Sequence, residues 1–406
     1  MQQTPNANRL QIGLFGARNS GKSSLLNAIV NENIATVSEI PGTTTDPVRK
    51  AMEAPNLGAV LFVDTAGLDD EDELGKLRVE KTIEAAKSVD IALIFFNGAN
   101  FDKTLNFLPH LKNAKKIAVI NKIDEMKDKG EELCKKVADK TKLPTVKVSA
   151  KTREGIDLLF SELLRVLPED YESASITGNL VDEGDVVMLV MPQDTGAPKG
   201  RLILPQVQTI RELLDKRAIV VCTVVEKMQD ALKKLVKPPE LIITDSQAFK
   251  RVYELKPKDT PLTSFSILFG NYKGDISYFI ESAKKMLELK ENAKILIAEA
   301  CAHRPLEEDI GQVKIPRLLR KKLGENIQIN FTSGRDFPTD LTNYDLIIHC
   351  GACMFNRRYV LQRVAAAKKQ NTPMTNYGVA IAALTGILGN VVYPKQQTFE
   401  NGDCYA

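Results

Sequence analysis

The 406-residue chain lacks any apolar run of the roughly 18–20 residues that a membrane-spanning helix requires. Its first residues, MQQTPNANRLQ, also lack the apolar core of a secretory signal peptide. The net charge of +3 is too small to draw the protein strongly toward nucleic acid or a membrane surface. We therefore expect a cytoplasmic protein with neither nucleic acid nor a membrane among its partners.

Cysteine and histidine are scarce, with six cysteines and three histidines in the whole chain. Six cysteines in a chain of this length do not indicate a disulfide framework. Three of them stand alone and are interpreted as ordinary free thiols: Cys134, Cys222 and Cys404. The other three are unusual because two of the three histidines lie close to them in the sequence.

Short apolar runs alternate with helical patterns along the whole chain, and this alternation predicts an α/β protein with mainly parallel sheets. The length is enough for two to four domains. Changes in the pattern predict three parts: residues 1–174, a small α/β domain at 175–262, and another at 263–406.

The sequence GARNSGKS lies between a predicted strand and a predicted helix, which is the context of a P-loop. Its glycines let main-chain N–H groups surround phosphates, and the start of the helix adds positive potential. We expect Lys22 to contact the β- and γ-phosphates and the Ser23 hydroxyl to bind Mg²⁺. The nucleotide-binding residues predicted here are Gly16, Asn19, Ser20, Gly21, Lys22, Ser23 and Ser24.

Three further motifs follow in the order expected of a GTPase. Asp64, in DTAG, ends an apolar strand and is expected to hold Mg²⁺ through water, while Gly67 gives its N–H to the γ-phosphate. Asp124, in NKID, can accept from two guanine N–H groups that adenine lacks. SAK is predicted to close over the base. The predicted base-site residues are Asn121, Lys122, Asp124, Ser149, Ala150 and Lys151.

Together these motifs resemble the translation-factor-related GTPases, the class that includes the Era and MnmE families. IPGTTTD resembles the first switch segment of that class, with Thr44, or else Thr43, as an Mg²⁺ ligand. The resemblance also implies that Asn19 helps to bind K⁺; a solvent-facing loop amide is the alternative. Leu68 stands where Ras-like enzymes have a glutamine that orients the attacking water, and its aliphatic side chain cannot do this. We therefore expect hydrolysis to need a positive charge supplied by some other group. The predicted catalytic residues are Lys22, Thr44, Asp64 and Gly67.

The C-terminal third contains CAH and HCGAC, each after a predicted buried strand. Because parallel strands end at one edge of a sheet, Cys301, Cys350 and Cys353 can converge there. The candidates for a fourth ligand are His303, His349, Glu307 and Glu308. Three thiolates and an imidazole suit zinc, whereas three thiolates with an exchangeable ligand suit a 4Fe–4S cluster. The spacing does not choose between them, and unligated structural thiols are the third interpretation.

As a whole, the chain resembles the HydF family, the GTPase scaffold of FeFe-hydrogenase maturation. The resemblance rests on the GTPase motifs, the small α/β middle domain and the terminal CAH…HCGAC pattern. It implies a 4Fe–4S cluster on Cys301, Cys350 and Cys353 beside GTP or GDP, Mg²⁺ and K⁺. It also implies a homodimer that carries a transient di-iron precursor, built with two radical-SAM enzymes, to apo FeFe-hydrogenase.

Two alternatives belong to other classes. One is a zinc-stabilised regulatory GTPase acting in RNA or ribosome biology; against it stand the small net charge and the absence of a recognisable basic RNA-binding module. The other makes the last domain an enzyme in its own right. That domain shows neither a nucleophile–base pair nor the closely spaced three-cysteine motif of radical-SAM enzymes.

Overall fold

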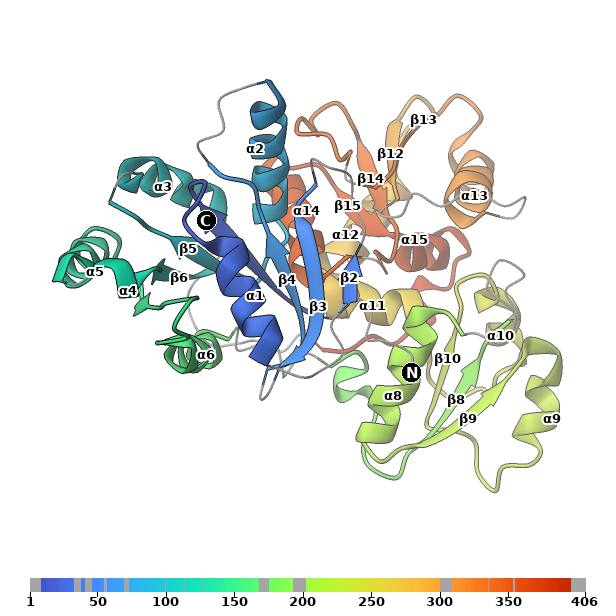
Figure 1. The fold of residues 1–406 in the computed structure, drawn as a ribbon. Helices are drawn as coiled ribbons and strands as arrows, with labels where there is room; N and C mark the ends of the chain where they lie inside the picture. The colour runs from blue at the N-terminus through green and yellow to red at the C-terminus, as the bar shows by residue number, and fades with distance from the viewer. Residues whose placement is uncertain are drawn as a thin grey trace. The chain divides into compact units, whose positions relative to one another are not determined.

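The computed structural model describes most of the chain, which divides into two compact units, Met1–Ser173 and Ala174–Ala406 (Figure 1). The described residues are 9–32, 38–40, 46–54, 57–68, 73–98, 100–112, 114–126, 128–167, 175–192, 202–299, 309–334, 336–352 and 355–395. None of the helices in these ranges combines the length and the apolarity needed to cross a lipid bilayer.

In the first unit, the described residues form one sheet of seven strands in the order β2-β3-β4-β1-β5-β6-β7. The strands pair in parallel except for the antiparallel pairs β2–β3 and β3–β4. They are β1 (Leu10–Gly16), β2 (Ser38–Ile40), β3 (Val48–Ala54), β4 (Gly58–Asp64), β5 (Ile91–Phe95), β6 (Lys115–Ile120) and β7 (Thr145–Lys147). Since β1 lies between β4 and β5, the loops that follow these three strands meet at one edge of the sheet.

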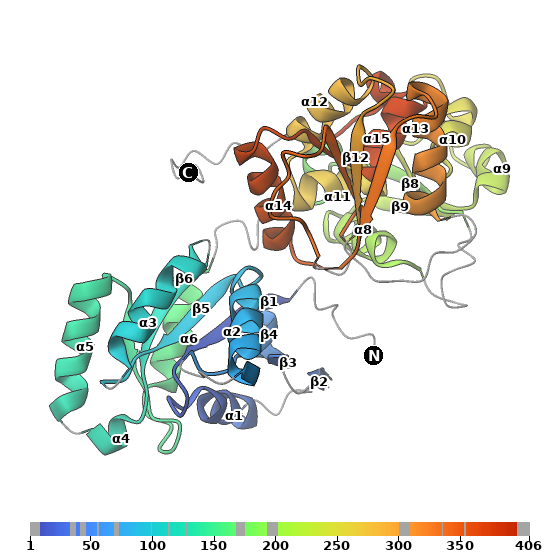
Figure 2. The ribbon, with the colours of Figure 1, turned by 90° about the horizontal axis from the view of Figure 1, so that it is seen from above.

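Helices cover both faces of this sheet (Figure 2). Side chains alternate between the faces of a strand, so Ile12 packs with Leu26 and Leu159, while Phe15 belongs to a second apolar cluster with Ala85 and Val137. The helices are α1 (Lys22–Glu32), α2 (Glu73–Ala86), α3 (Phe101–Phe107), α4 (Ile123–Met126), α5 (Asp128–Thr141) and α6 (Ile156–Arg165), with a 3₁₀ turn at Leu108–Leu111.

The second unit contains two sheets within the described ranges, each of four parallel strands. The first has the order β11-β10-β8-β9 and the second β13-β12-β14-β15. The strands are β8 (Val186–Val190), β9 (Ile219–Thr223), β10 (Leu241–Thr244), β11 (Leu262–Ser264), β12 (Lys294–Ala298), β13 (Gln328–Thr332), β14 (Leu346–His349) and β15 (Met374–Asn376). Met188 and Ile242 from the first sheet share one apolar core with Ile295 and Ile348 from the second.

The helices of the second unit connect these parallel strands, as crossover connections require. They are α8 (Leu204–Asp215), α9 (Met228–Leu232), α10 (Phe249–Leu255), α11 (Phe265–Lys273), α12 (Ile276–Met286), α13 (Ile315–Leu323), α14 (Arg357–Lys369) and α15 (Tyr377–Leu384). Short 3₁₀ turns lie at Gly178–Leu180, Val225–Lys227 and Leu388–Asn390, and a π-helical turn at Ile310–Lys314 precedes α13. Helix α11 begins directly after β11, because Ser264 accepts a hydrogen bond from the amide of Ile267 and caps the helix.

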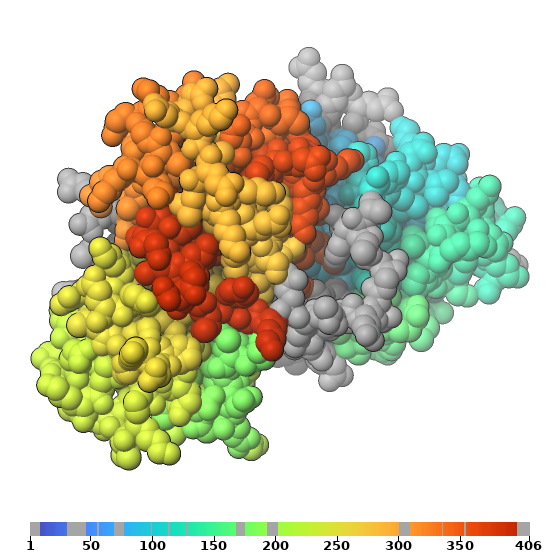
Figure 3. Space-filling view, turned by 180° about the vertical axis from the view of Figure 1, so that it is seen from behind, coloured from blue at the N-terminus to red at the C-terminus, as the bar shows by residue number. Residues whose placement is uncertain are grey.

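Residues 391–395 return to the first sheet of this unit. In the space-filling view, the red end of the described chain lies against the green segment that begins this unit (Figure 3). The amide of Val392 donates to the carbonyl oxygen of Leu262 at 2.9 Å, and the amide of Lys395 donates to Oδ1 of Asn179 at 2.8 Å. Gly178 has a positive φ of 52°, and a Cβ atom there would lie 2.7 Å from Cβ of Pro394. The returning segment therefore closes tightly over the turn at residues 178–179.

The predicted fold class, a P-loop GTPase domain followed by smaller α/β domains with mainly parallel sheets, is confirmed. The division into residues 1–174, 175–262 and 263–406 stays a prediction. Its second boundary falls inside strand β11, which pairs with β10.

Candidate functional site

The P-loop connects β1 to α1, and its glycines are required by close contacts. Gly16 and Gly21 have positive φ angles of 157° and 86°. A Cβ atom at Gly16 would lie 2.7 Å from Cβ of Phe95, and one at Gly21 would overlap Nδ2 of Asn121. Asn19 is also in the left-handed region, at φ 59°. This backbone forms the tight loop expected of a phosphate site.

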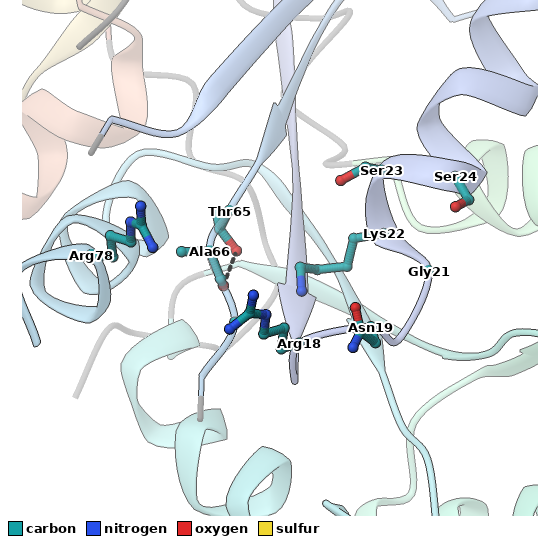
Figure 4. A pocket seen from close by; sticks show the side chains of 10 residues that line it. Arg18, Asn19, Gly21, Lys22, Ser23, Ser24, Thr65, Ala66 and Arg78 are labelled. Carbon is teal, nitrogen blue, oxygen red and sulfur yellow. Dashed lines mark hydrogen bonds between the residues drawn. The ribbon is translucent and has the colours of Figure 1, made fainter. Parts of the chain in front are cut away.

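A cavity of about 460 Å³ opens at this loop, within the usual size range of ligand sites (Figure 4). It is lined by Arg18, Asn19, Gly21, Lys22, Ser23, Ser24, Thr65, Ala66, Gly67 and Arg78. Arg18, Lys22 and Arg78 are cations, whereas the described lining includes no carboxylate. This charge suits an anionic ligand such as a nucleotide phosphate.

Lys22 is held inside the loop. Its Nζ atom donates to the carbonyl oxygens of Gly16 and Ala17, each at 2.9 Å, and the side chain is 6% exposed. Carbonyl acceptors stabilise an ammonium group that burial would otherwise destabilise. The cation therefore lies where the loop would surround a phosphate.

Ser23 and Asp64 form the oxygen site expected for Mg²⁺. The Ser23 hydroxyl donates to Oδ2 of Asp64, and Oδ1 of Asp64 is buried without a hydrogen-bond partner in the described structure. Burial raises the pKa of the Asp64 carboxyl, although Ser23 and the charges of Lys22 and Lys50 act in the opposite direction. Hard oxygen donors with an unsatisfied carboxylate oxygen fit Mg²⁺. Thr43 and Thr44, the other predicted ligands, lie outside the described residues.

Hydrogen bonds attach Thr65 of the DTAG segment, and Leu68 directly after it, to strand β1 and the start of the P-loop. The Thr65 hydroxyl donates to the carbonyl oxygen of Leu14 at 2.6 Å, and the amide of Leu68 donates to the carbonyl oxygen of Gly16 at 3.3 Å. Gly67 lines the cavity, whereas the Leu68 side chain packs against the apolar cluster that contains Phe15. Leu68 therefore offers no polar group to a water molecule.

Asn121 connects the phosphate loop to the base loops. Its Nδ2 atom donates to the carbonyl oxygens of Gly21 and Ser20, at 3.1 and 3.3 Å. Its Oδ1 atom accepts from the amides of Lys122 and Ala150, at 2.8 and 3.2 Å. The structure thus brings together the predicted residues of GARNSGKS, NKID and SAK.

Ser149 positions the carboxylate predicted to recognise guanine. Its hydroxyl donates to Oδ1 of Asp124 at 2.7 Å and accepts from the amide of Thr152 at 3.0 Å. Ser149 is fully buried, while Asp124 and Lys151 are exposed. A buried hydroxyl thus fixes one oxygen of Asp124 at the rim of the site.

Arg18 and Arg78 line the cavity although the sequence motifs did not predict them. Arg18 lies inside GARNSGKS, but the P-loop pattern assigns no role to that position. Arg78 comes from α2, beyond the DTAG motif, and reaches the cavity on the side of Thr65 and Ala66 (Figure 4). The missing glutamine indicated that a positive charge should lie near the site. The sequence did not show which residue supplies it, and only the position of α2 shows that Arg78 lines the cavity.

Cys350 lies where two parallel strands end. It follows β14, and its amide donates at 2.9 Å to the carbonyl oxygen of Ala298, the last residue of β12. The amide of Ala352 approaches its Sγ atom at 3.4 Å. The remaining predicted ligands lie outside the described residues: Cys301, His303, Glu307, Glu308 and Cys353. Within the described ranges, no three or more His, Cys, Asp or Glu residues gather as a metal site.

His349 is buried and hydrogen-bonded through both ring nitrogens. Nε2 lies 2.9 Å from Nη1 of Arg363, and Nδ1 lies 2.7 Å from the carbonyl oxygen of Cys350. A guanidinium only donates, so Nε2 accepts and Nδ1 carries the proton. Burial, together with the Arg363 charge, lowers the pKa of His349 to about 3. As placed, the neutral ring directs neither nitrogen toward a metal.

Three family models match the chain. The 50S ribosome-binding GTPase model matches residues 11–122. The Hydrogen maturase F dimerization domain matches residues 176–274, and the Hydrogen maturase F tetramerization domain matches residues 277–394.

Individual proteins match part of the chain. The mitochondrial tRNA modification GTPase MSS1 of Saccharomyces cerevisiae is 35% identical over 183 residues, 41% of this chain and 33% of that protein. GTPase Der of Wolinella succinogenes is 34% identical over 168 residues, 39% of this chain and 36% of that protein. The chain thus spans about a third of the length of these relatives. A crystal structure of Era from Aquifex aeolicus has 19% identity and a TM-score of 0.34, over 55% of this chain and 97% of that one.

Proposed function

The chain is a GTP hydrolase that belongs to the hydrogen maturase F family, and on this premise we propose that it is the scaffold that carries a di-iron precursor to apo FeFe-hydrogenase. The observation that carries the proposal is the position of Cys350, at the common end of β12 and β14 in a unit matched by both hydrogen maturase F domains. The dimerization and tetramerization domains support an oligomer, and we propose a homodimer as its basic unit.

The proposed cofactor is a 4Fe–4S cluster held by Cys301, Cys350 and Cys353. Soft thiolates suit iron–sulfur clusters, and the N–H group of Ala352 directed at Sγ of Cys350 is the kind of hydrogen bond that stabilises cluster sulfur. When bound, such a cluster would supply an iron with an exchangeable fourth ligand. His303 and Glu308, with Glu307 beside it, remain candidates for that ligand. His349 is the least suited, because both of its nitrogens are already hydrogen-bonded.

GTP hydrolysis is assigned to the first unit. Lys22 binds the β- and γ-phosphates, Ser23 and Asp64 hold Mg²⁺, and Gly67 contacts the γ-phosphate. Because Leu68 cannot orient water, the charge that assists hydrolysis must come from another group. We assign K⁺ at Asn19 to that role, with Thr44 as the switch residue that senses the γ-phosphate.

The GTPase cycle is proposed to control which partner binds. Switch segments that order around the γ-phosphate and loosen after hydrolysis change the surface offered to a partner. A tenfold preference between the two states requires only about 1.4 kcal/mol of differential binding. The partners are the radical-SAM maturation enzymes and apo FeFe-hydrogenase.

The first experiment is anaerobic reconstitution with iron and sulfide, followed by metal analysis and absorption spectroscopy. Wild type should take up an oxygen-sensitive 4Fe–4S cluster, and Cys350→Ala should lose most of the iron. Cys134→Ala, which changes an isolated thiol in the first unit, is the matched control. Stoichiometric zinc in anaerobically purified protein, with no iron uptake, would instead support the zinc-stabilised GTPase acting on RNA or ribosomes.

The second experiment separates the cluster from the switch. Lys22→Ala should retain the cluster, abolish GTP turnover and fail to support hydrogenase activation. Surface-binding kinetics under anaerobic conditions should show that partners dissociate at different rates from the GTP and GDP forms of wild type. Lys135→Ala, at an exposed lysine of the same unit, is the control. Equal dissociation in both states, for every partner tested, would remove the proposed role of the switch.

A further inference from the structure

Lys273, the last residue of α11, is a buried cation that belongs to none of the sequence motifs. It is 2% exposed, and its Nζ atom donates to the carbonyl oxygens of Ala352 and Phe355, each at 2.9 Å. Its Nζ atom also lies 5.8 Å from the centre of the Phe269 ring. Burying an ammonium group is costly unless hydrogen-bond acceptors surround it, so these contacts are a built feature of the interior.

The two carbonyl groups bracket Cys353 in the sequence. One Nζ atom binds both, so it holds together the two ends of the segment 352–355. The amide of Phe355 also donates to the carbonyl oxygen of Ala352 at 3.1 Å. Ala352 is 1% exposed and has a positive φ of 49°, a backbone conformation that is strained for a residue other than glycine. A strained, buried residue persists because its surroundings fix it, and Lys273 is part of those surroundings.

The other end of the same loop is fixed as firmly. Arg363 lies between the rings of Phe337 and Tyr359, at 4.5 and 4.6 Å, and donates to the Tyr359 hydroxyl and to His349. His349 in turn donates to the carbonyl oxygen of Cys350. Buried cations of the protein itself therefore anchor both sides of the loop.

From this geometry we infer that Lys273 is a positioning residue for the metal loop: it holds Ala352 and Phe355, on either side of Cys353, in their binding conformation before a metal arrives, and its charge favours the reduced form of the bound cluster. The inference rests on the proposed function for the identity of the group that binds. A loop that is already ordered before the metal binds loses less conformational entropy on binding, so the metal binds more tightly. A positive charge beside a cluster stabilises the additional electron of the reduced state.

The first test uses full-length wild-type protein without metal. Hydrogen–deuterium exchange should show slow exchange at the amides of Cys350 and Phe355, which are hydrogen-bonded to Ala298 and Ala352. Exchange at the rate of an unstructured peptide would overturn the inference without any mutation being made.

The second test compares Lys273→Met with Lys284→Met, which changes an exposed lysine on the neighbouring helix α12. In metal-free Lys273→Met, exchange at Phe355 and alkylation of Cys350 by iodoacetamide should be roughly tenfold faster or more, the effect of losing a charge-assisted hydrogen bond. Lys284→Met should match wild type in both measurements. Rates in Lys273→Met equal to those of wild type would contradict the positioning role.

The third measurement is the midpoint potential of the reconstituted cluster, followed by EPR during redox titration. Lys273→Met should shift it to a more negative value, while Lys284→Met should not. A loop role without an electrostatic one would leave the potential unchanged and overturn that half of the inference. If wild type binds no cluster at all, the proposed function fails, whereas the exchange and alkylation results still decide whether Lys273 fixes the loop.

Discussion

The side-chain nitrogen of Asn121 lies 3.1 Å from the carbonyl oxygen of Gly21, although 100 residues separate them in sequence. The same amide group holds the backbone of Ala150 through its oxygen. One side chain therefore joins the loop predicted to surround phosphate to the loop predicted to close over the base. We expect this residue to link the binding of the two ends of a nucleotide.

Ser149→Ala should weaken binding of GDP about three- to tenfold, because Asp124 loses the hydrogen bond that positions it. Isothermal titration calorimetry measures this change, and Ser161→Ala, at an exposed serine on α6, should have no effect. Asp124→Asn should shift preference from guanosine to xanthosine nucleotides. Unchanged GDP affinity in Ser149→Ala would show that Asp124 does not depend on this contact.

GTP hydrolysis by wild type should be faster in potassium than in sodium at equal ionic strength. Asn19, at φ 59° on the cavity wall, is the residue assigned to the ion. Asn19→Ala should lose most of this difference while retaining Mg²⁺ dependence. Phosphate release in the two salts measures the effect, and equal wild-type rates in both would remove K⁺ from the mechanism.

Arg78→Gln should lower the kcat of GTP hydrolysis roughly tenfold or more, as loss of a charge near transferring phosphate does. Affinity for GDP should change much less, because Arg78 lines the cavity beside the DTAG segment, where the γ-phosphate is expected. Lys81→Gln on the same helix is the control, since Lys81 pairs with Asp46 and Glu84 at the surface. Equal losses in GDP affinity and kcat would indicate that Arg78 only binds nucleotide.

His349 should make the metal-free second unit less stable as pH falls. Its pKa is about 3 when folded and near 6.5 when unfolded, so between these values only the unfolded state takes up the proton. The free energy of unfolding is therefore full above pH 6.5 and falls below it, by up to about 1.4 kcal/mol per pH unit.

Hydrogen exchange of the core strands β12 and β14 between pH 7.5 and 4.5, corrected for the intrinsic exchange rate, measures this dependence. His349→Gln should flatten it, whereas His110→Gln, at an exposed histidine of the first unit, should leave it unchanged. A dependence that persists unaltered in His349→Gln would assign it to other groups.

The meeting of the GARNSGKS, NKID and SAK loops could be predicted from sequence because each motif follows the end of a predicted strand. Strand order then follows from the rules of parallel sheets, and the structure brings the loops of Gly21, Asn121 and Ser149 together. Arg78 could not be predicted, because α2 carries several cations and only its packing on the sheet selects the one that lines the cavity.

The second unit shows the same limit more clearly. His349 beside Cys350 has the sequence pattern of a metal ligand, but Arg363, 14 residues later, occupies its second nitrogen. Lys273 belongs to no motif, and its partner Ala352 lies 79 residues away. Local sequence patterns identify strands and their ends. Contacts between residues far apart in sequence, such as Lys273 and Ala352, depend on how the helices pack against those strands.

Residues 391–395 have a consequence for how the protein is made. Asn179 leaves the ribosome 216 residues before Lys395, the residue that closes over it. In strand β11, the carbonyl oxygen of Leu262 likewise gains its hydrogen bond from the amide of Val392 only after that residue has been synthesised. Since contacts between residues far apart in sequence form late, strand β11 and the turn at residues 178–179 lack these hydrogen-bond partners on the growing chain. Nascent protein stalled before residue 391 is therefore expected to be a substrate for chaperones, and a truncation there a substrate for proteases.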